Sequence, residues 1–232
     1  TSEAPDLAAL RDLCRRHGAR LMVDVTHDLG ILGPTGRGML ELQDVRGTID
    51  IVLGQLSTAF AADAGFVASD HPGLAVALRV GRGPLASGAA LAPVQAAVAL
   101  AALDIVQSPE GALRRGRLMD NALLLREGLA AAGLAVAGIP SAVVPVYLGA
   151  RARARRITAA VLAAGAVVHL DEPPESRPEP AHEDCHWRLR PGADHAPADL
   201  ARFVAAVRQA LSQAQDPAWS PGGSPRPGGA GR

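Results

Sequence analysis

The stretch RLMVDVTHDLGILGPTGRG, residues 20–38, places a short apolar run before an acidic residue and a glycine-rich turn. The apolar residues predict a strand over Arg20–Val25, with Asp24 near its end and His27 three residues further on. Because Gly and Pro break regular structure, we expect a loop over residues 26–38 and then a short helix near residues 39–45. The stretch therefore indicates a strand that leads into a polar loop.

Outward from this stretch, the pattern is that of an α/β protein. Residues 50–56 and 65–69 are nearly continuous apolar runs, which is typical of strands covered by helices on both faces. Helices are expected at residues 5–17, 71–80, 92–107, 110–132, 150–164 and 199–211, and later strands at residues 143–148, 167–171 and 187–190.

The long helix expected from residue 110 could carry the chain into another domain. We expect a partial large domain over residues 1–109, then this helix and a small α+β domain over residues 110–214. The tail, residues 215–232, is rich in Pro, Gly and Ser and is expected to be disordered.

Composition excludes several classes of protein. With 232 residues and 48% hydrophobic content, the chain is long enough to bury a core. Its formal net charge is zero, so we expect no nucleic-acid partner. The densest basic cluster is Arg151, Arg153, Arg155 and Arg156, and we expect a solvated helix face there in preference to a phosphate site.

The longest apolar run, residues 86–106, is interrupted by Pro93, Gln95 and Asp104. These interruptions favour a buried helix over a membrane span. The apolar stripe over residues 96–105 is accordingly expected to be core or dimer interface.

The chain has two cysteines, Cys14 and Cys185, which cannot build a disulfide framework. No signal peptide is predicted at its start, so the expected location is the cytoplasm. His182, Cys185 and His186 have a spacing that could bind zinc, but a fourth ligand is lacking. A polar loop is expected there, and no metal site is predicted.

Four segments, taken in order, carry a resemblance to a known family. They are Asp-x-x-His at 24–27 with its glycine-rich turn, DIVLGQLSTAF at 50–60, ALDIVQSPEG at 102–111 and WRLRP at 187–191. Together they resemble the α-oxoamine synthases, which include 8-amino-7-oxononanoate synthase and serine palmitoyltransferase. These are fold-type-I pyridoxal-phosphate enzymes of the aminotransferase class I/II superfamily, and they condense an amino acid with an acyl-CoA thioester.

The resemblance covers about residues 5–211 and implies the C-terminal portion of the family's fold. That portion is part of an α/β large domain with a mostly parallel sheet, followed by a small C-terminal α+β domain. A complete member places well over a hundred residues before the Asp-x-x-His strand, which implies that the first half of the fold is lost or comes from another polypeptide. Members are dimers, so a homo- or heterodimeric partner of related fold is implied, without a membrane span.

The resemblance also implies roles for Asp24 and His27. The family's cofactor is pyridoxal 5'-phosphate, and a carboxylate beside its pyridinium nitrogen keeps the ring protonated as an electron sink. Asp24 stands in that position, and His27 would lie near the ring's 3-oxygen or the substrate carbonyl. The alternatives are a strand-end carboxylate that caps a neighbouring loop, and a surface histidine.

Thr58 stands where the family has the lysine that holds the cofactor as a Schiff base and moves the substrate's α-proton. All 23 Lys and Arg residues of the chain are arginine, so no other side chain can form that imine. Gln55 replaces a phosphate-binding threonine. Ala89 and Ala90 replace hydroxyl groups that reach the partner subunit's phosphate. These changes remove groups that hold the cofactor.

Arg188 and Arg190 resemble the family's Arg-Leu-Arg, in which an arginine binds the substrate carboxylate through a bidentate fork. Alternating arginines also occur on edge strands without such a role.

Three hypotheses follow. The chain is a catalytically degenerate homologue that acts as a non-catalytic partner subunit; or its acyltransferase site is completed by a lysine-bearing partner; or it is a non-functional truncated product. Acyl-CoA and an amino acid are ligands only where a partner completes the site.

Overall fold

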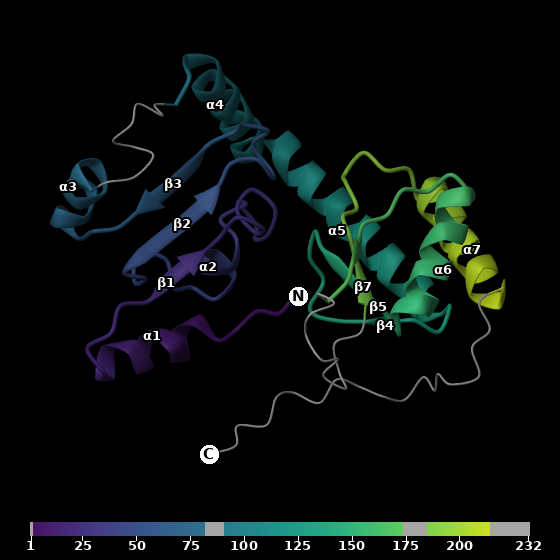
Figure 1. Cartoon of the computed structure of the whole chain (residues 1–232). Coiled ribbons are helices and arrows are strands. Elements are labelled where there is room, and N and C mark those ends of the chain that lie inside the picture. Colours follow the sequence, from purple (N-terminus) through teal and green to yellow (C-terminus); the bar gives the residue numbers. More distant parts are fainter. Residues whose placement is uncertain (1, 82–90, 174–184, 214–232) are drawn as a thin grey trace. The chain divides into compact units, whose positions relative to one another are not determined.

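The computed structural model describes residues 2–81, 91–173 and 185–213. Contacts within the chain divide it into two compact units, shown in Figure 1. The first unit is Ala4–Gly116, and the second unit is Thr1–Glu3 with Arg117–Arg232. Helix α5 (Pro109–Ala130) begins in the first unit and ends in the second.

The first unit carries a three-stranded sheet of order β1-β2-β3. Its elements before α5 are α1 (Leu7–Arg16), β1 (Met22–Asp24), α2 (Met39–Leu42), β2 (Ile51–Gln55), β3 (Gly65–Ala68), α3 (Pro72–Val80) and α4 (Pro93–Gln107). Strands β1 and β2 are parallel, whereas β2 and β3 are antiparallel. The described sheet is mixed because the connection from β2 to β3 is short, whereas a parallel crossover needs a much longer one. A hydrogen bond from Leu56 N to Ala64 O (2.8 Å) closes this connection.

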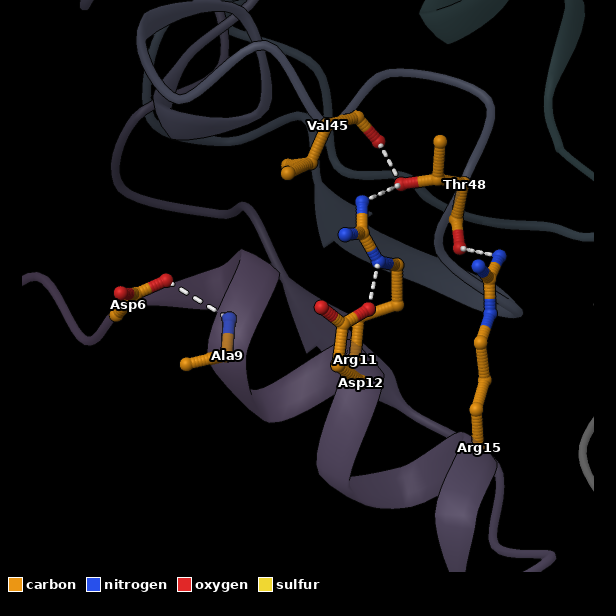
Figure 2. Close-up of polar contacts among 7 residues, drawn as sticks. All are labelled: Asp6, Ala9, Arg11, Asp12, Arg15, Val45 and Thr48. Carbon is orange, nitrogen blue, oxygen red and sulfur yellow. Dashed lines mark hydrogen bonds and ion pairs between the residues drawn. The ribbon is translucent and has the colours of Figure 1, made fainter.

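Helix α1 is capped and then anchored by its polar side chains (Figure 2). The Asp6 carboxylate accepts a hydrogen bond from Ala9 N (2.8 Å), as expected of a helix N-cap. On the next turns, Arg11 donates to Thr48 Oγ1 and Arg15 donates to the Thr48 carbonyl oxygen. These contacts fix α1 against the chain that leads into β2.

Apolar side chains of the first unit are only partly covered by the described residues. On α1, Leu7 is buried, but Leu10 and Leu13 of the expected apolar face are 37% and 44% exposed. Helix α4 is apolar on all sides, yet none of its residues is buried. A helix that is apolar all round normally lies inside a protein, so the described residues of the first unit leave an apolar surface uncovered.

The second unit has a four-stranded antiparallel sheet of order β4-β5-β7-β6. Its strands are β4 (Ala135–Val136), β5 (Val144–Gly149), β6 (Leu170–Asp171) and β7 (Cys185–Leu189), and its helices besides α5 are α6 (Arg151–Ala163) and α7 (Pro197–Gln213). The sequence pattern did not predict β4, because two residues are too short to show a period.

The core of the second unit lies between its sheet and its helices. Trp187 on β7 is fully buried, and its indole N–H donates to Thr158 Oγ1 on α6 (2.9 Å). Arg153 of α6 is 7% exposed and donates to the carbonyl oxygen of Leu148, so the expectation of a solvated arginine face is wrong for this residue. The long arginine stem reaches the strand-end carbonyl while its polar end stays hydrogen-bonded.

Among the described residues, no single helix is long and apolar enough to cross a membrane, although the bent pair α4 and α5 meets that test together. The tail expected over residues 215–232 lies outside the described residues.

Candidate functional site

The carboxyl ends of β1 and β2 meet at one edge of the sheet of the first unit. Asp24 is the last residue of β1 and Gln55 is the last residue of β2. Because these strands are parallel, with Asp24 in register with Leu53, both residues leave the sheet on the same side. Gln55 N donates to Thr26 Oγ1 (3.0 Å), which joins the two loops that follow the strands. We call this group of strand ends and loops the strand-end site.

Asp24 is exposed, and its Oδ1 accepts a hydrogen bond from Thr26 N (2.8 Å). The carboxylate therefore caps the loop that follows its own strand, which is close to the alternative expected of a strand-end carboxylate without a cofactor role. His27 follows in the same loop with an exposed side chain. The structure thus brings Asp24, His27 and Gln55 to one edge, where their polar groups face solvent.

Thr58 lies in the loop between β2 and β3. Its side chain is exposed, but the loop beneath it is anchored by Phe60 and Ala62, which are 5% and 1% exposed. Both residues donate backbone hydrogen bonds to the carbonyl oxygen of Leu56. Thr58 is therefore held on a packed loop beside the ends of the strands.

The glycine-rich loop after β1 packs against the loop of Thr58. Gly30 has a φ of +80°, and a Cβ atom there would come within 2.7 Å of the Ala59 Cβ. Ala61, on the opposite loop, has a φ of +51°, which is unusual for a residue other than glycine. Close approach of Gly30 to the Ala59 side chain explains why a residue without a side chain stands at position 30.

Asp28 is a residue whose importance the sequence pattern did not show. Its Oδ2 accepts a hydrogen bond from Met39 N at the start of α2 (2.7 Å), whereas its Oδ1 is buried and accepts none from the described residues. Burial raises the pKa of this carboxyl, and the nearby charge of Asp24 acts in the same direction, against the lowering effect of the Met39 N–H. The only signal in the sequence was its place beside His27 in a glycine-rich turn.

The strand-end site fits pyridoxal phosphate only in part. Asp24 supplies a carboxylate of the kind that pairs with a protonated ring nitrogen, and Thr26 and Thr58 supply hydroxyl groups. An amine that could form an imine with the cofactor's aldehyde is missing, because Thr58 presents a hydroxyl and no side chain of the sequence is a lysine. The residues present are suited to non-covalent contacts and not to covalent attachment.

The two predicted substrate arginines belong to the second unit. Arg188 lies on β7 and forms two hydrogen bonds to Asp171, from Nε to Oδ2 (2.5 Å) and from Nη2 to Oδ1 (3.1 Å). This contact lowers the pKa of Asp171 and raises that of Arg188. Arg190 follows the end of β7 and is exposed.

Several sequence predictions lie outside the described residues. Ala89 and Ala90 are among them, as are His182 and Glu183 of the possible zinc loop. Cys185 is buried, whereas His186 next to it is half-buried. Searching residues 2–81, 91–173 and 185–213 finds no group of three or more His, Cys, Asp or Glu side chains placed to hold a metal ion.

Comparison with known proteins places residues 1–207 in the family described as aminotransferase class I and II. Two curated relatives are 8-amino-7-oxononanoate synthases. That of Geobacter metallireducens is 39% identical over 203 residues, which are 86% of this chain and 51% of the relative. That of Bordetella petrii is 34% identical over 212 residues, 90% of this chain and 52% of the relative. The chain thus spans about half the length of these relatives.

Solved structures of serine palmitoyltransferases have the same fold. The enzyme of S. paucimobilis, solved with a bound adduct of PLP and myriocin, aligns with a TM-score of 0.79 and 31% identity over 90% of this chain and 51% of that one. The enzyme of Sphingomonas wittichii aligns with a TM-score of 0.81 and 25% identity over 91% of this chain and 52% of that one. The α/β fold of type I, with its sheet and helices, is therefore confirmed.

Proposed function

Because the chain belongs to the aminotransferase class I and II family and is homologous to α-oxoamine synthases, we propose that it is a degenerate member that does not catalyse the condensation alone and acts as a non-catalytic partner subunit. The observation that carries this proposal is Thr58, which stands at the position of the family's lysine in a sequence without lysine. The proposal places the chain in the cytoplasm, where Cys14 and Cys185 stay reduced.

The loss of the lysine removes two steps that the family's chemistry needs. Pyridoxal phosphate, when bound, stabilises the carbanion formed at the substrate's α-carbon. A threonine hydroxyl neither forms an imine nor accepts the α-proton near neutral pH, because its pKa is far too high without an activating base. Asp24 and His27 keep the polar character of the strand-end site, but neither supplies an amine.

A partner is supported by the uncovered apolar surface of the first unit. On α3, Val76 and Val80 are 61% and 77% exposed, and on α4 Val94 and Leu100 are 66% and 63% exposed. These side chains have no cover among the described residues of the chain, which spans about half of its relatives' length. We propose that a second chain of related fold covers them, as a homo- or heterodimer.

Two other functions remain as alternatives. The solvent-facing carboxylate of Asp24 favours a site that a lysine-bearing partner completes, which would then condense an amino acid with an acyl-CoA. The same exposed helices favour a non-functional truncated product, which would aggregate through its apolar surface.

Borohydride trapping with pyridoxal phosphate, combined with an assay of CoA release, separates the partner subunit from the site that a partner completes. Absorbance between roughly 320 and 430 nm and peptide mapping would be recorded for the chain alone, for the chain with a co-expressed family member, and for Thr58→Lys with Ser57→Lys as matched control. Release of CoA from an acyl-CoA and an amino acid would be measured for the chain alone and for the complex, with and without Asp24→Asn. We expect the chain alone to carry no trapped cofactor, and Thr58→Lys to gain it at the new lysine while Ser57→Lys does not.

Each outcome of this experiment is informative. The partner-subunit proposal is supported if the cofactor is trapped on a co-purifying partner and if Asp24→Asn leaves CoA release by the complex unchanged. Loss of CoA release in the complex on Asp24→Asn favours the completed site instead. Release of CoA from an amino acid and an acyl-CoA by the chain alone would overturn the proposal.

A further inference from the structure

A polar row crosses three strands of the second unit. Tyr147 of β5 lies opposite His186 of β7, and His186 lies opposite Asp171 of β6. Because side chains alternate along a strand, Arg188 shares the face of His186, whereas Trp187 points into the core. Asp171 therefore lies directly opposite His186 and diagonally opposite Arg188, and the long side chain of Arg188 can reach the Asp171 carboxylate.

Asp171 and Arg188 form a bidentate ion pair, the geometry in which arginine commonly binds carboxylates. Its two oxygens lie 2.5 and 3.1 Å from Nε and Nη2 of Arg188. Two imidazoles approach the same carboxylate, with Nε2 of His169 at 3.3 Å and Nε2 of His186 at 3.5 Å. Two parallel N–H donors on a planar guanidinium match one carboxylate, so Asp171 occupies the Nε/Nη2 edge of Arg188.

We propose that Asp171 is an internal ligand of the Nε/Nη2 edge of Arg188, so that an external carboxylate, of the class of an amino acid, binds this edge only by displacing Asp171. This inference rests on the family membership that underlies the proposed function, because the resemblance gives Arg188 the family's carboxylate-binding role. Asp171 then determines whether Arg188 can bind an external carboxylate at this edge.

The strand that carries Asp171 is held in place by a second ion pair. Glu172, the next residue, receives hydrogen bonds from Nε and Nη2 of Arg155 (2.7 and 2.6 Å) on α6. The backbone of Asp171 is paired with His186 in the ladder between β6 and β7. Asp171 is thus tethered beside Arg188 at a high effective concentration, which a free carboxylate has to overcome.

Displacement is nevertheless feasible, because the fork is reachable from solvent. The side chain of Arg188 is 42% exposed and that of Asp171 is 22% exposed. Ion pairs with this much solvent contact are weak, so removing Asp171 should strengthen binding of an external carboxylate by about twofold to fivefold.

Side-chain NMR of the full chain tests the proposal directly. The Nε–H resonance of Arg188, assigned by its loss in Arg188→Lys, would be followed during titration with sodium acetate. The chains compared are the unchanged protein, Asp171→Ala and Asp171→Asn. Asp199→Ala is the matched control, because Asp199 is paired with Arg202 on the surface of α7. Sodium chloride at equal ionic strength controls for screening.

We expect a saturable shift in Asp171→Ala, with an acetate dissociation constant about twofold to fivefold lower than in the unchanged chain and in Asp199→Ala. Asp171→Asn keeps the shape of the side chain and should fall between them. Equal acetate affinity in all chains, or an equal response to chloride, would overturn the proposal. No cofactor enters this titration, so its result is independent of whether pyridoxal phosphate is trapped on any chain.

Discussion

Asp28 is the residue whose ionisation most directly concerns the stability of the strand-end site. Its carboxylate is partly buried, and one of its oxygens has no hydrogen-bond partner among the described residues. The pKa is therefore raised above 3.8, chiefly by burial. Between the pKa of the unfolded chain and this raised value, the folded protein binds more protons than the unfolded one. The contribution of Asp28 to stability must therefore fall as pH rises through that window.

The substitution Asp28→Asn tests whether the contribution of Asp28 to stability falls as pH rises. The asparagine oxygen can still accept the N–H of Met39, and the side chain no longer ionises. We expect the free energy of unfolding of Asp28→Asn to equal or exceed that of the unchanged chain at neutral pH by up to about 1 kcal/mol. The difference should shrink or reverse below pH 4. Urea unfolding at several pH values measures it, and a difference that does not change with pH would contradict the assignment.

At the scale of single residues, the sequence predicted where a residue lies in its strand better than which side chains it contacts. The apolar run before Asp24 was enough to place that residue at a strand end, and the run before Gln55 did the same. Pairing of Arg188 with Asp171 could not be predicted, because it depends on the register of β6 against β7. Burial of Asp28 depends likewise on how the glycine loop folds back over it, with Gly38 leaving no room for a Cβ beside the Asp28 carboxylate.

Among the elements, the loops that frame the strand-end site depend on backbone shape more than on side-chain bonds. Gly30 combines a positive φ with a contact that a Cβ would make at 2.7 Å from Ala59. Gly30→Ala should therefore destabilise the first unit by about 1 to 3 kcal/mol, from strain at positive φ and from the clash. Thermal or urea unfolding checks the loss. Gly47→Ala is a suitable control, since Gly47 also has positive φ but nothing within 4 Å of its Cβ position. An equal loss in both variants would show that strain alone acts.

The opposite change is expected at Ala61. This residue has a φ of +51° in the loop that carries Thr58. Ala61→Gly should raise the free energy of unfolding by about 0.5 to 1 kcal/mol, because relief of the left-handed strain outweighs the added entropy of the unfolded chain. A loss of stability in Ala61→Gly would mean that the methyl group packs favourably enough to offset its strain.

Elements with clear end signals were predicted well. Ser108-Pro109-Glu110 predicted the start of a helix, and α5 begins at Pro109 with Ser108 Oγ accepting a hydrogen bond from Gly111 N (3.3 Å). The strand expected from residue 167 is shorter in the structure, where β6 is Leu170–Asp171 and Val167 is 88% exposed. An apolar run predicts a strand only where a neighbour pairs with it, and that pairing is not local in sequence.

For the whole molecule, the covering of α4 decides between a partner subunit and an isolated product. Val94 and Leu100 are apolar, exposed and not part of the core of the first unit. Replacing both by glutamine should therefore cost no more than about 0.5 kcal/mol of stability in the chain alone. The same replacement should weaken association with a second chain at least tenfold, because burying each of these side chains contributes about 1.5 to 3 kcal/mol.

Light scattering on size-exclusion fractions, over a range of concentrations and with a co-expressed family member, measures this association. Leu162→Gln is the matched control, since Leu162 is 56% exposed but lies on α6 of the second unit. The partner proposal requires a defined dimer that the α4 variant dissociates and the control does not. Aggregates of undefined size that the α4 variant disperses would favour the truncated product, because a non-specific apolar surface associates without fixed stoichiometry. A monomer at every concentration, with no complex formed, would remove the basis for a partner at α4.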